Sequence, residues 1–305
     1  MILSLYFLFF PTQAKVTTLK YINLGNTGLE VSSLGLGVEH LKNKPVEEIT
    51  NVLETAIENG VNYFDLVWSL PDVIQGVSQA TINKDVHLAV HLGSSYRNGK
   101  YVKAKSVKRC EETFRETLDR LDKDSISLIN LHYVKNMKEW NRVSKLNGVL
   151  DLAIRLRDEG LGKVIALSTH EIDVVRMAAV HSEIASVMYQ VNIANHVLPG
   201  RDEVLSICAE NGVGVVAMKP FAAGNLLKPG KMVKFPDYKT GGLRTELRVP
   251  GSLSEYKCLH YSLSQMGVCC VVFCAKTVEE LERNLDYYSI GKNESEYTDE
   301  LSLLY

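Results

Sequence analysis

Eight short apolar runs alternate with amphipathic helical stretches along most of the chain, and this alternation constrains the fold more than any other feature. The runs are nearly continuous in apolar residues, which is typical of parallel strands that are buried on both faces. They cover residues 31–37, 61–65, 86–91, 125–132, 163–170, 186–192, 213–220 and 269–275. A helical pattern follows each run, so the order of elements predicts an α/β protein with a parallel sheet.

An eightfold β/α repeat in a chain of 305 residues indicates one (β/α)8 TIM barrel. A doubly wound sheet is the structural alternative, but no strand leads into a GxGxxG turn: "LGLGVEH" has Gly35 and Gly37 without a third glycine. We therefore predict a single barrel domain over residues 20–305. Residues 1–19 are expected to be a leader or disordered extension. Their apolar start, "MILSLYFLFFP", is too short to span a bilayer and lacks basic residues, so secretion is the minority interpretation.

The composition excludes some classes of function. Acidic and basic residues are well mixed and the formal net charge is -2, which argues against a general nucleic-acid or membrane-surface binder. The six cysteines form no CxxC pair, and three of them lie in or beside the apolar run at 269–275. This pattern favours reduced core thiols in a cytoplasmic protein. It gives no indication of the oligomeric state.

Polar side chains stand at the C-terminal tips of nearly all the predicted strands. In barrels of this class the active site is built at that end of the strands. The tips carry Asp65, His91, His132, Ser168 with Thr169 and His170, Gln190 with Asn192, Lys219, and Lys276 after Ala275. If these tips point inward, strand alternation places a layer beneath them that consists of Tyr63, Ala89, Asn130, Ala166 and Met188. The pattern therefore predicts a shared polar mouth.

Several segments resemble the aldo-keto reductase family over residues 20–285. The segments are "YINLGNTGLEVSSLGLG", "GVNYFD", "ETLDRLDKDSISLINLH", "DEGLGKVIALSTH", "CAENGVGVVAMKPFAAGNLL" and "KTVEELERNL". The resemblance implies a barrel that reduces small-molecule carbonyls with NADPH. The "MKP" and "STH" segments are similar to the branch that includes iron–sulfur members. No cysteine-rich tail precedes Tyr305, so no iron–sulfur cluster is predicted. No metal cofactor is predicted either.

Members of this family use a Tyr as general acid, a Lys and an Asp that tune it, and a His that orients the carbonyl. A free phenol has a pKa of about 10, so a nearby cation is needed to make it a useful acid. Asp65 matches the family Asp and His132 the family His, while His91 stands at the Lys position. The segment after Asp65, "LVWSLPD", contains no tyrosine and has Trp68 or Leu70 in its place. The resemblance thus implies a degenerate active site, in which His91 is a candidate proton donor because imidazole titrates near pH 6.5.

The resemblance also implies a set of cofactor-binding residues at the later strand ends. Ser168 and Gln190 match residues that hold the nicotinamide carboxamide, and Met218 could pack on the nicotinamide ring. Lys276 matches a basic position near the 2′-phosphate, but Glu280 stands where relatives carry Arg or Gln and would weaken phosphate binding. NADP(H) is favoured and NAD(H) is the alternative. The full set is Ser168, Thr169, Gln190, Met218, Lys219, Ala275, Lys276, Glu280 and Asn284.

Three functions remain open from the sequence. The first is an oxidoreductase that acts on a carbonyl or alcohol with an altered proton donor. The second is a catalytically inactive nucleotide-binding pseudoenzyme or regulatory subunit with the same barrel. The third is a metal-dependent hydrolase that uses Asp65, His91, His132 and His170, although the usual HxH pair is absent. The Lys-rich loop over residues 226–253 either covers the cofactor or the mouth, or is a solvated surface loop.

Overall fold

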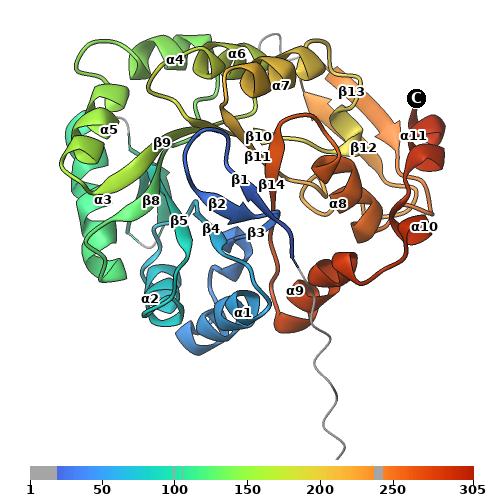
Figure 1. Ribbon diagram of the computed structural model, residues 1–305, viewed down its shortest axis with the longest axis horizontal. Coiled ribbons are helices and arrows are strands. Elements are labelled where there is room, and N and C mark those ends of the chain that lie inside the picture. Colours follow the sequence, from blue (N-terminus) through green and yellow to red (C-terminus); the bar gives the residue numbers. More distant parts are fainter. Residues whose placement is uncertain (1–18, 99, 105, 237–242) are drawn as a thin grey trace, which may run out of the picture.

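The computed structural model describes residues 19–98, 100–104, 106–236 and 243–305. Eight parallel strands close into a barrel in the hydrogen-bonded order β4-β3-β14-β11-β10-β9-β8-β5, and β5 pairs back with β4. The predicted TIM barrel is therefore confirmed (Figure 1). The strands are β3 (Leu34–Gly37), β4 (Tyr63–Leu66), β5 (His87–Leu92), β8 (Ile126–Leu131), β9 (Gly162–Thr169), β10 (Ser186–Gln190), β11 (Gly214–Met218) and β14 (Val268–Phe273).

Helices surround the barrel (Figure 1). Their buried apolar side chains belong to the same core cluster as those of the strands. In α3 (Val107–Leu121) Cys110, Phe114, Leu118 and Leu121 form a buried stripe. Full burial of a side chain such as Leu or Phe contributes about 1.5–3 kcal/mol relative to its exposure. The other main helices are α1 (Val46–Glu58), α2 (Pro71–Ala80), α4 (Met137–Val143), α5 (Val149–Asp158), α6 (Ile172–Ala179), α7 (Arg201–Glu210), α8 (Glu255–Leu263) and α9 (Val278–Leu285).

The predicted strand over residues 31–37 is two strands in the structure. Its first part belongs to β2 (Glu30–Ser32), which pairs with β1 (Tyr21–Asn23) in an antiparallel hairpin, and only its second part, β3, enters the barrel. The hairpin lies across the end of the barrel at which the strands begin (Figure 1). Leu24, Leu29 and Val31 pack there against the barrel interior, so this end is closed and the other end remains for a site.

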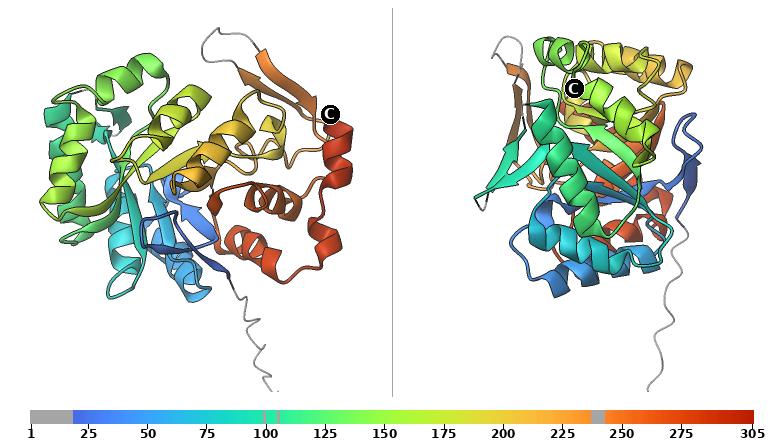
Figure 2. Two further views of the ribbon diagram at one scale, coloured as in Figure 1. Left: turned by 45° about the horizontal axis from the view of Figure 1, so that its top comes forward. Right: turned by 90° about the vertical axis from the view of Figure 1, so that its left-hand side faces the viewer.

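Two hairpins extend from the opposite face of the molecule, and both were missed from the sequence (Figure 2, right). The first, β6 (Ser94–Arg97) with β7 (Lys100–Lys103), follows directly on β5, with Leu92 paired to Ser94. The second, β12 (Met232–Pro236) with β13 (Leu243–Arg248), occupies the segment expected to be a loop. Their alternating residues favour strands, but only packing against the barrel gives such short hairpins stability.

The β12–β13 hairpin packs on a small apolar cluster beside the barrel. Val233, Leu247 and Val249 pack on a small apolar cluster that includes Tyr261 of α8. Two further helices, α10 (Lys292–Ser295) and α11 (Thr298–Leu304), end the chain on the same side (Figure 1). No helix in the described part of the chain is long and apolar enough to cross a membrane. The leader predicted over residues 1–19 lies, except for Leu19, outside the described residues.

Candidate active site

A cavity of about 450 Å³ opens at the C-terminal ends of the barrel strands. Its wall combines apolar side chains from β10, β11 and β14 with polar groups from β4, β5, β8 and β9. Among the predicted site residues it is lined by Asp65, His91, His132, Ser168, Met218 and Lys219. Of the layer expected beneath the tips, Tyr63, Ala89, Ala166 and Met188 lie in the interior cluster of the barrel and Asn130 is fully buried, while Met188 also reaches the cavity wall. Strand alternation therefore predicted which of these side chains point into the barrel.

Asp65, His91 and His132 form a continuous hydrogen-bonded chain at the base of the cavity. Asp65 Oδ1 lies 2.7 Å from His91 Nε2, and His91 Nδ1 lies 2.9 Å from His132 Nδ1. All three residues are less than a tenth exposed. Burial, the neighbouring His91 and the charge of Lys103 lower the pKa of His132 well below its usual value, so its neutral form dominates at neutral pH. Both ring nitrogens of His91 are thus engaged, one by a carboxylate and one by a second imidazole.

A tyrosine that was not among the predicted site residues joins this hydrogen-bonded chain from the β6–β7 hairpin. The Tyr101 hydroxyl is hydrogen-bonded to His132 Nε2, and its ring lines the cavity. The ring of Trp68 packs edge-on against it, with centroids 4.3 Å apart and planes at 81°. The segment after Asp65 contains no tyrosine, as its sequence shows, but the cavity wall includes a tyrosine from another segment. Trp68, which stands near the position of the family tyrosine, packs against the ring of Tyr101 from the β6–β7 hairpin.

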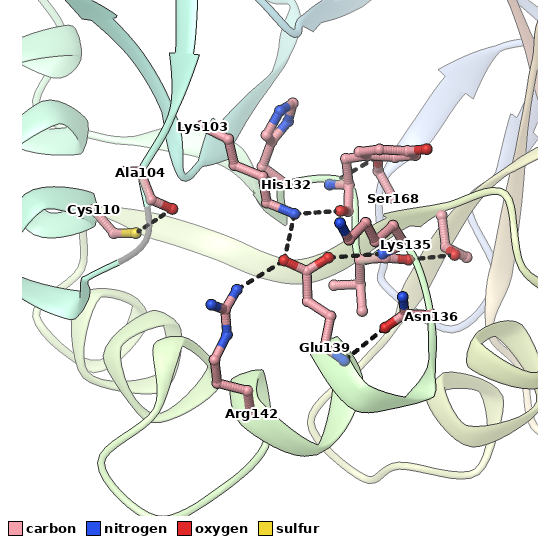
Figure 3. A network of polar contacts seen from close by, with 12 residues as sticks. Lys103, Ala104, Cys110, His132, Lys135, Asn136, Glu139, Arg142 and Ser168 are labelled. Carbon is pink, nitrogen blue, oxygen red and sulfur yellow. Dashed lines mark hydrogen bonds and ion pairs between the residues drawn. The ribbon is translucent and has the colours of Figure 1, made fainter. Parts of the chain in front are cut away.

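The hairpin that carries Tyr101 is fastened to the barrel by Lys103 (Figure 3). Lys103 Nζ donates hydrogen bonds to the carbonyl oxygen of Tyr133 at 2.5 Å and to Glu139 Oε1 at 2.7 Å. Burial raises the pKa of Glu139, but the hydrogen bond from Lys103, the Lys135 backbone N–H and the charge of Arg142 outweigh it and lower that pKa overall. Glu139 is therefore a buried carboxylate with three partners, and it joins β7 to α4.

The predicted cofactor residues fall into two groups. Near the cavity, Ser168 and Met218 lie on its wall, and Lys219 follows with a left-handed backbone (φ +57°). Gln190 is buried nearby at the end of β10 but is not among the described lining residues. Thr169 is fully buried, and its hydroxyl donates to the Val134 carbonyl and accepts from the Glu171 N–H. These bonds leave Thr169 with a structural role beside the site.

The second group lies at the start of α9. Thr277 caps this helix, because its hydroxyl accepts a hydrogen bond from the Glu280 N–H at 3.2 Å. Glu280 Oε2 in turn accepts from the Lys276 backbone N–H at 2.8 Å, so a carboxylate occupies the helix N-terminus. Ala275 is buried at the preceding strand end, and Asn284 is buried one turn after Glu280. Asn284 Oδ1 has no hydrogen-bond partner among the described residues.

The proposed metal ligands line one cavity, but their donor atoms face one another and not a common centre. In the described ranges no group of three or more His, Cys, Asp or Glu side chains is disposed to hold a metal ion. His91 uses one ring nitrogen for Asp65 and the other for His132, and His132 uses its second nitrogen for Tyr101. The geometry does not support the metal-dependent hydrolase.

One signal in the sequence could have revealed Tyr101. The stretch "SSYRNGKYVK" alternates side chains around Asn-Gly, which is a strong short-range hairpin signal. In the structure Asn98 has φ +50°, as such a turn requires, and Tyr96 pairs with Tyr101 across the ladder. No local sequence pattern indicates that this hairpin lies over the cavity, because its position depends on the long-range contact between Lys103 and Glu139.

A parallel barrel with a polar cavity at the C-terminal strand ends defines a class of barrel enzymes, and comparison with known proteins identifies the family. The sequence profile of the aldo/keto reductase family matches residues 33–241. The uncharacterized oxidoreductase YqkF of Bacillus subtilis (strain 168) is 26% identical over 284 residues, which cover 86% of this chain and 89% of that protein. L-galactose dehydrogenase of Arabidopsis thaliana is 25% identical over 292 residues, or 88% of each protein.

Solved structures agree on the fold. The holo form of the aldo-keto reductase AKR11C1 from Bacillus halodurans superposes with a TM-score of 0.73 at 22% identity and covers 93% of this chain and 96% of that chain. A putative aldo-keto reductase from Pseudomonas aeruginosa gives a TM-score of 0.65 at 18% identity, over 88% of this chain and 94% of that one. The chain belongs to the aldo/keto reductase family of oxidoreductases. The predicted family is confirmed.

Proposed function

We propose that the protein is an NAD(P)H-dependent oxidoreductase that interconverts a small carbonyl compound and its alcohol. One observation carries the proposal: a single cavity joins the retained Asp65 and His132 to the residues that would hold a nicotinamide, Ser168 and Met218. Small, partly apolar cavities with a few convergent polar groups suit neutral carbonyl substrates. The bound dinucleotide would supply the hydride, and the protein's own residues would supply orientation and the proton.

The residues of this chain fit a dinucleotide at both ends. At the nicotinamide end, Met218 and the neighbouring apolar wall offer a surface for a flat ring, with the Ser168 hydroxyl beside it. At the adenine end, Asn284 Oδ1 is an acceptor without a partner among the described residues, and an adenine amino group would satisfy it. Glu280 disfavours a 2′-phosphate by its charge, whereas a carboxylate at this type of position can accept hydrogen bonds from a ribose diol. Both NADPH and NADH therefore need to be tested.

A second candidate is a nucleotide-binding protein without turnover, and the state of the phenol favours it. Burial, with smaller effects from Tyr133, Glu139 and Glu39, raises the pKa of Tyr101 to about 12, which makes it a weak acid. The Tyr101 hydroxyl is hydrogen-bonded to His132, and the nearby Lys103 is bound to Glu139 and the Tyr133 carbonyl. In this second candidate the protein still binds the dinucleotide, but it no longer donates a proton to a carbonyl.

Cofactor titration followed by turnover separates these functions. Thermal-shift and fluorescence titrations with NADPH and NADH measure binding, and a broad panel of aldehydes, ketones and sugars with each cofactor measures oxidation at 340 nm. Saturable binding together with carbonyl-dependent oxidation supports the oxidoreductase. Binding with no oxidation across the panel and in the reverse direction supports the inactive candidate, and a lack of binding to either cofactor refutes both.

A further inference from the structure

We infer that Tyr101, delivered by the β6–β7 hairpin, is the catalytic proton donor, and that His132, His91 and Asp65 form a relay that returns its proton. The inference rests on the proposed oxidoreductase function and assigns its acid. His91 is poorly placed to donate a proton to a substrate itself, because this imidazole is 3% exposed and hydrogen-bonded at both nitrogens. Tyr101 also lines the cavity, but its hydroxyl stands at the end of the hydrogen-bonded chain, with His132 as its partner.

The direction of every hydrogen bond in the neutral chain follows from the carboxylate. Ionised Asp65 can only accept, so His91 Nε2 carries a hydrogen and His91 Nδ1 has a lone pair. That lone pair accepts from His132 Nδ1–H, which leaves His132 Nε2 to accept from the Tyr101 hydroxyl. The Asn130 amide nitrogen lies 3.2 Å from His91 Nε2, and a 180° rotation brings its oxygen there to accept. In this state the phenol hydrogen points into the protein and not at a substrate.

One added proton reverses the chain. With a hydrogen on both nitrogens, His91 donates to Asp65 and to His132 Nδ1, and its positive charge lies against the carboxylate. His132 then carries its hydrogen on Nε2 and donates it to the Tyr101 oxygen. The phenol hydrogen is released from His132 and becomes free to point into the cavity. A hydrogen bond to the phenol oxygen also stabilises the phenolate that forms on donation.

The proton transfers balance over one reduction. The carbonyl carbon gains hydride from a reduced nicotinamide, and the carbonyl oxygen gains the Tyr101 proton. The phenolate takes a proton from His132 Nε2, His132 Nδ1 takes one from His91 Nδ1, and His91 returns to its neutral form with Nε2–H still on Asp65. The neutral chain that remains is the form that accepts a proton from an alcohol in the reverse reaction. Solvent recharges the relay before the next reduction.

Several charged or titratable groups face the Tyr101 phenol and its partner His132. Glu39, Glu139 and the Tyr133 hydroxyl oppose ionisation of Tyr101, while Lys103 opposes protonation of His132. The carboxylate of the relay is Asp65, which is hydrogen-bonded to His91. Because reduction consumes one proton and alcohol oxidation releases one, reduction should slow and alcohol oxidation should quicken as the pH rises.

The decisive variants are Tyr101→Phe and, as its matched control, Tyr96→Phe. Tyr96 pairs with Tyr101 across the hairpin but lines a small hollow with Thr113 and Arg120, outside the cavity. We expect Tyr101→Phe to lower kcat about 100-fold or more, the lower range for loss of a general acid, with cofactor affinity changed less than about twofold. Tyr96→Phe should keep both. Tyr133→Phe tests the other tyrosine of the cavity wall.

A second readout needs neither cofactor nor turnover. In ¹⁵N-labelled protein at pH 8, His91 should be protonated on Nε2 and His132 on Nδ1, and Tyr101→Phe should shift the His132 Nε2 resonance. The opposite tautomers overturn the relay. Turnover that survives in Tyr101→Phe within about threefold, or that is lost in Tyr133→Phe instead, overturns the assignment of the acid while the proposed function stands. Wild-type protein that binds a cofactor but never turns over refutes the oxidoreductase itself, and the catalytic assignment with it.

Discussion

The ion pair between Lys103 and Glu139 should be the main fastening of the β6–β7 hairpin, and a double-mutant cycle can measure it. Lys103 Nζ lies 2.7 Å from Glu139 Oε1, and the side chains are 25% and 8% exposed. Hydrogen bonds to charged groups contribute about 1.5–3 kcal/mol, and partial exposure of the lysine places this one near the lower limit. We therefore expect a coupling free energy of about 1.5 kcal/mol.

The single variants should cost more than the coupling, because each also removes other contacts. Lys103→Met loses the hydrogen bond to the Tyr133 carbonyl, and Glu139→Gln weakens the bonds from Arg142 and the Lys135 N–H. Each is expected to lower the free energy of unfolding by about 2–3 kcal/mol.

Urea unfolding of the wild type, both singles and the double variant gives the coupling, and hydrogen exchange of residues 94–98 and 100–103 reports on the hairpin itself. Lys100→Met is the control, because Lys100 is exposed on the same strand and should change stability by less than about 0.5 kcal/mol. Additive effects within about 0.3 kcal/mol, or unchanged exchange in the hairpin, would refute the reasoning.

Two further predictions concern charge. Glu280→Gln removes the carboxylate from the start of α9 and should tighten NADPH binding about fivefold relative to NADH by Coulomb energy alone; Glu282→Gln, exposed on the same helix, should not, and an equal gain for both cofactors would contradict the assignment. Burial and the charge of Lys219 lower the pKa of His170 to about 3, so the folded state keeps this imidazole neutral. The stability from that preference is present above pH 6.5 and declines by about 1.4 kcal/mol per pH unit as the pH falls from 6.5 toward 3. His170→Gln should flatten this slope in urea unfolding measured from pH 7 to pH 4.5; an unchanged slope would show that His170 does not cause it.

Much of the site was predictable because its residues stand at the ends of strands. Asp65, His91, His132 and Ser168 follow apolar runs directly, and parallel strands in a barrel bring their C-terminal ends to one face. Strand alternation then decides which side chains point inward, so these four line one cavity as predicted. Local pattern and topology were enough for this half of the site.

The tyrosine was not predictable in the same way. Tyr101 lies in a different segment from Asp65, and the turn signal in "YRNGKY" predicts a hairpin without saying where it folds. Its place over the cavity depends on the Lys103–Glu139 pair and on the edge of the Trp68 ring. Each of these contacts joins residues far apart in sequence, so no local pattern records them.

The sequence by itself therefore determined the barrel, the face that carries the site, and the three buried residues Asp65, His91 and His132, because these follow from hydrophobic periodicity and strand order. Only the tertiary structure decided that the hydrogen-bonded chain of these three residues ends at the hydroxyl of Tyr101. That outcome depends on long-range packing of a hairpin, whose position a one-dimensional pattern cannot encode. The stretch after Asp65 lacks the expected tyrosine, and Trp68 within it contacts the tyrosine that the fold brings there.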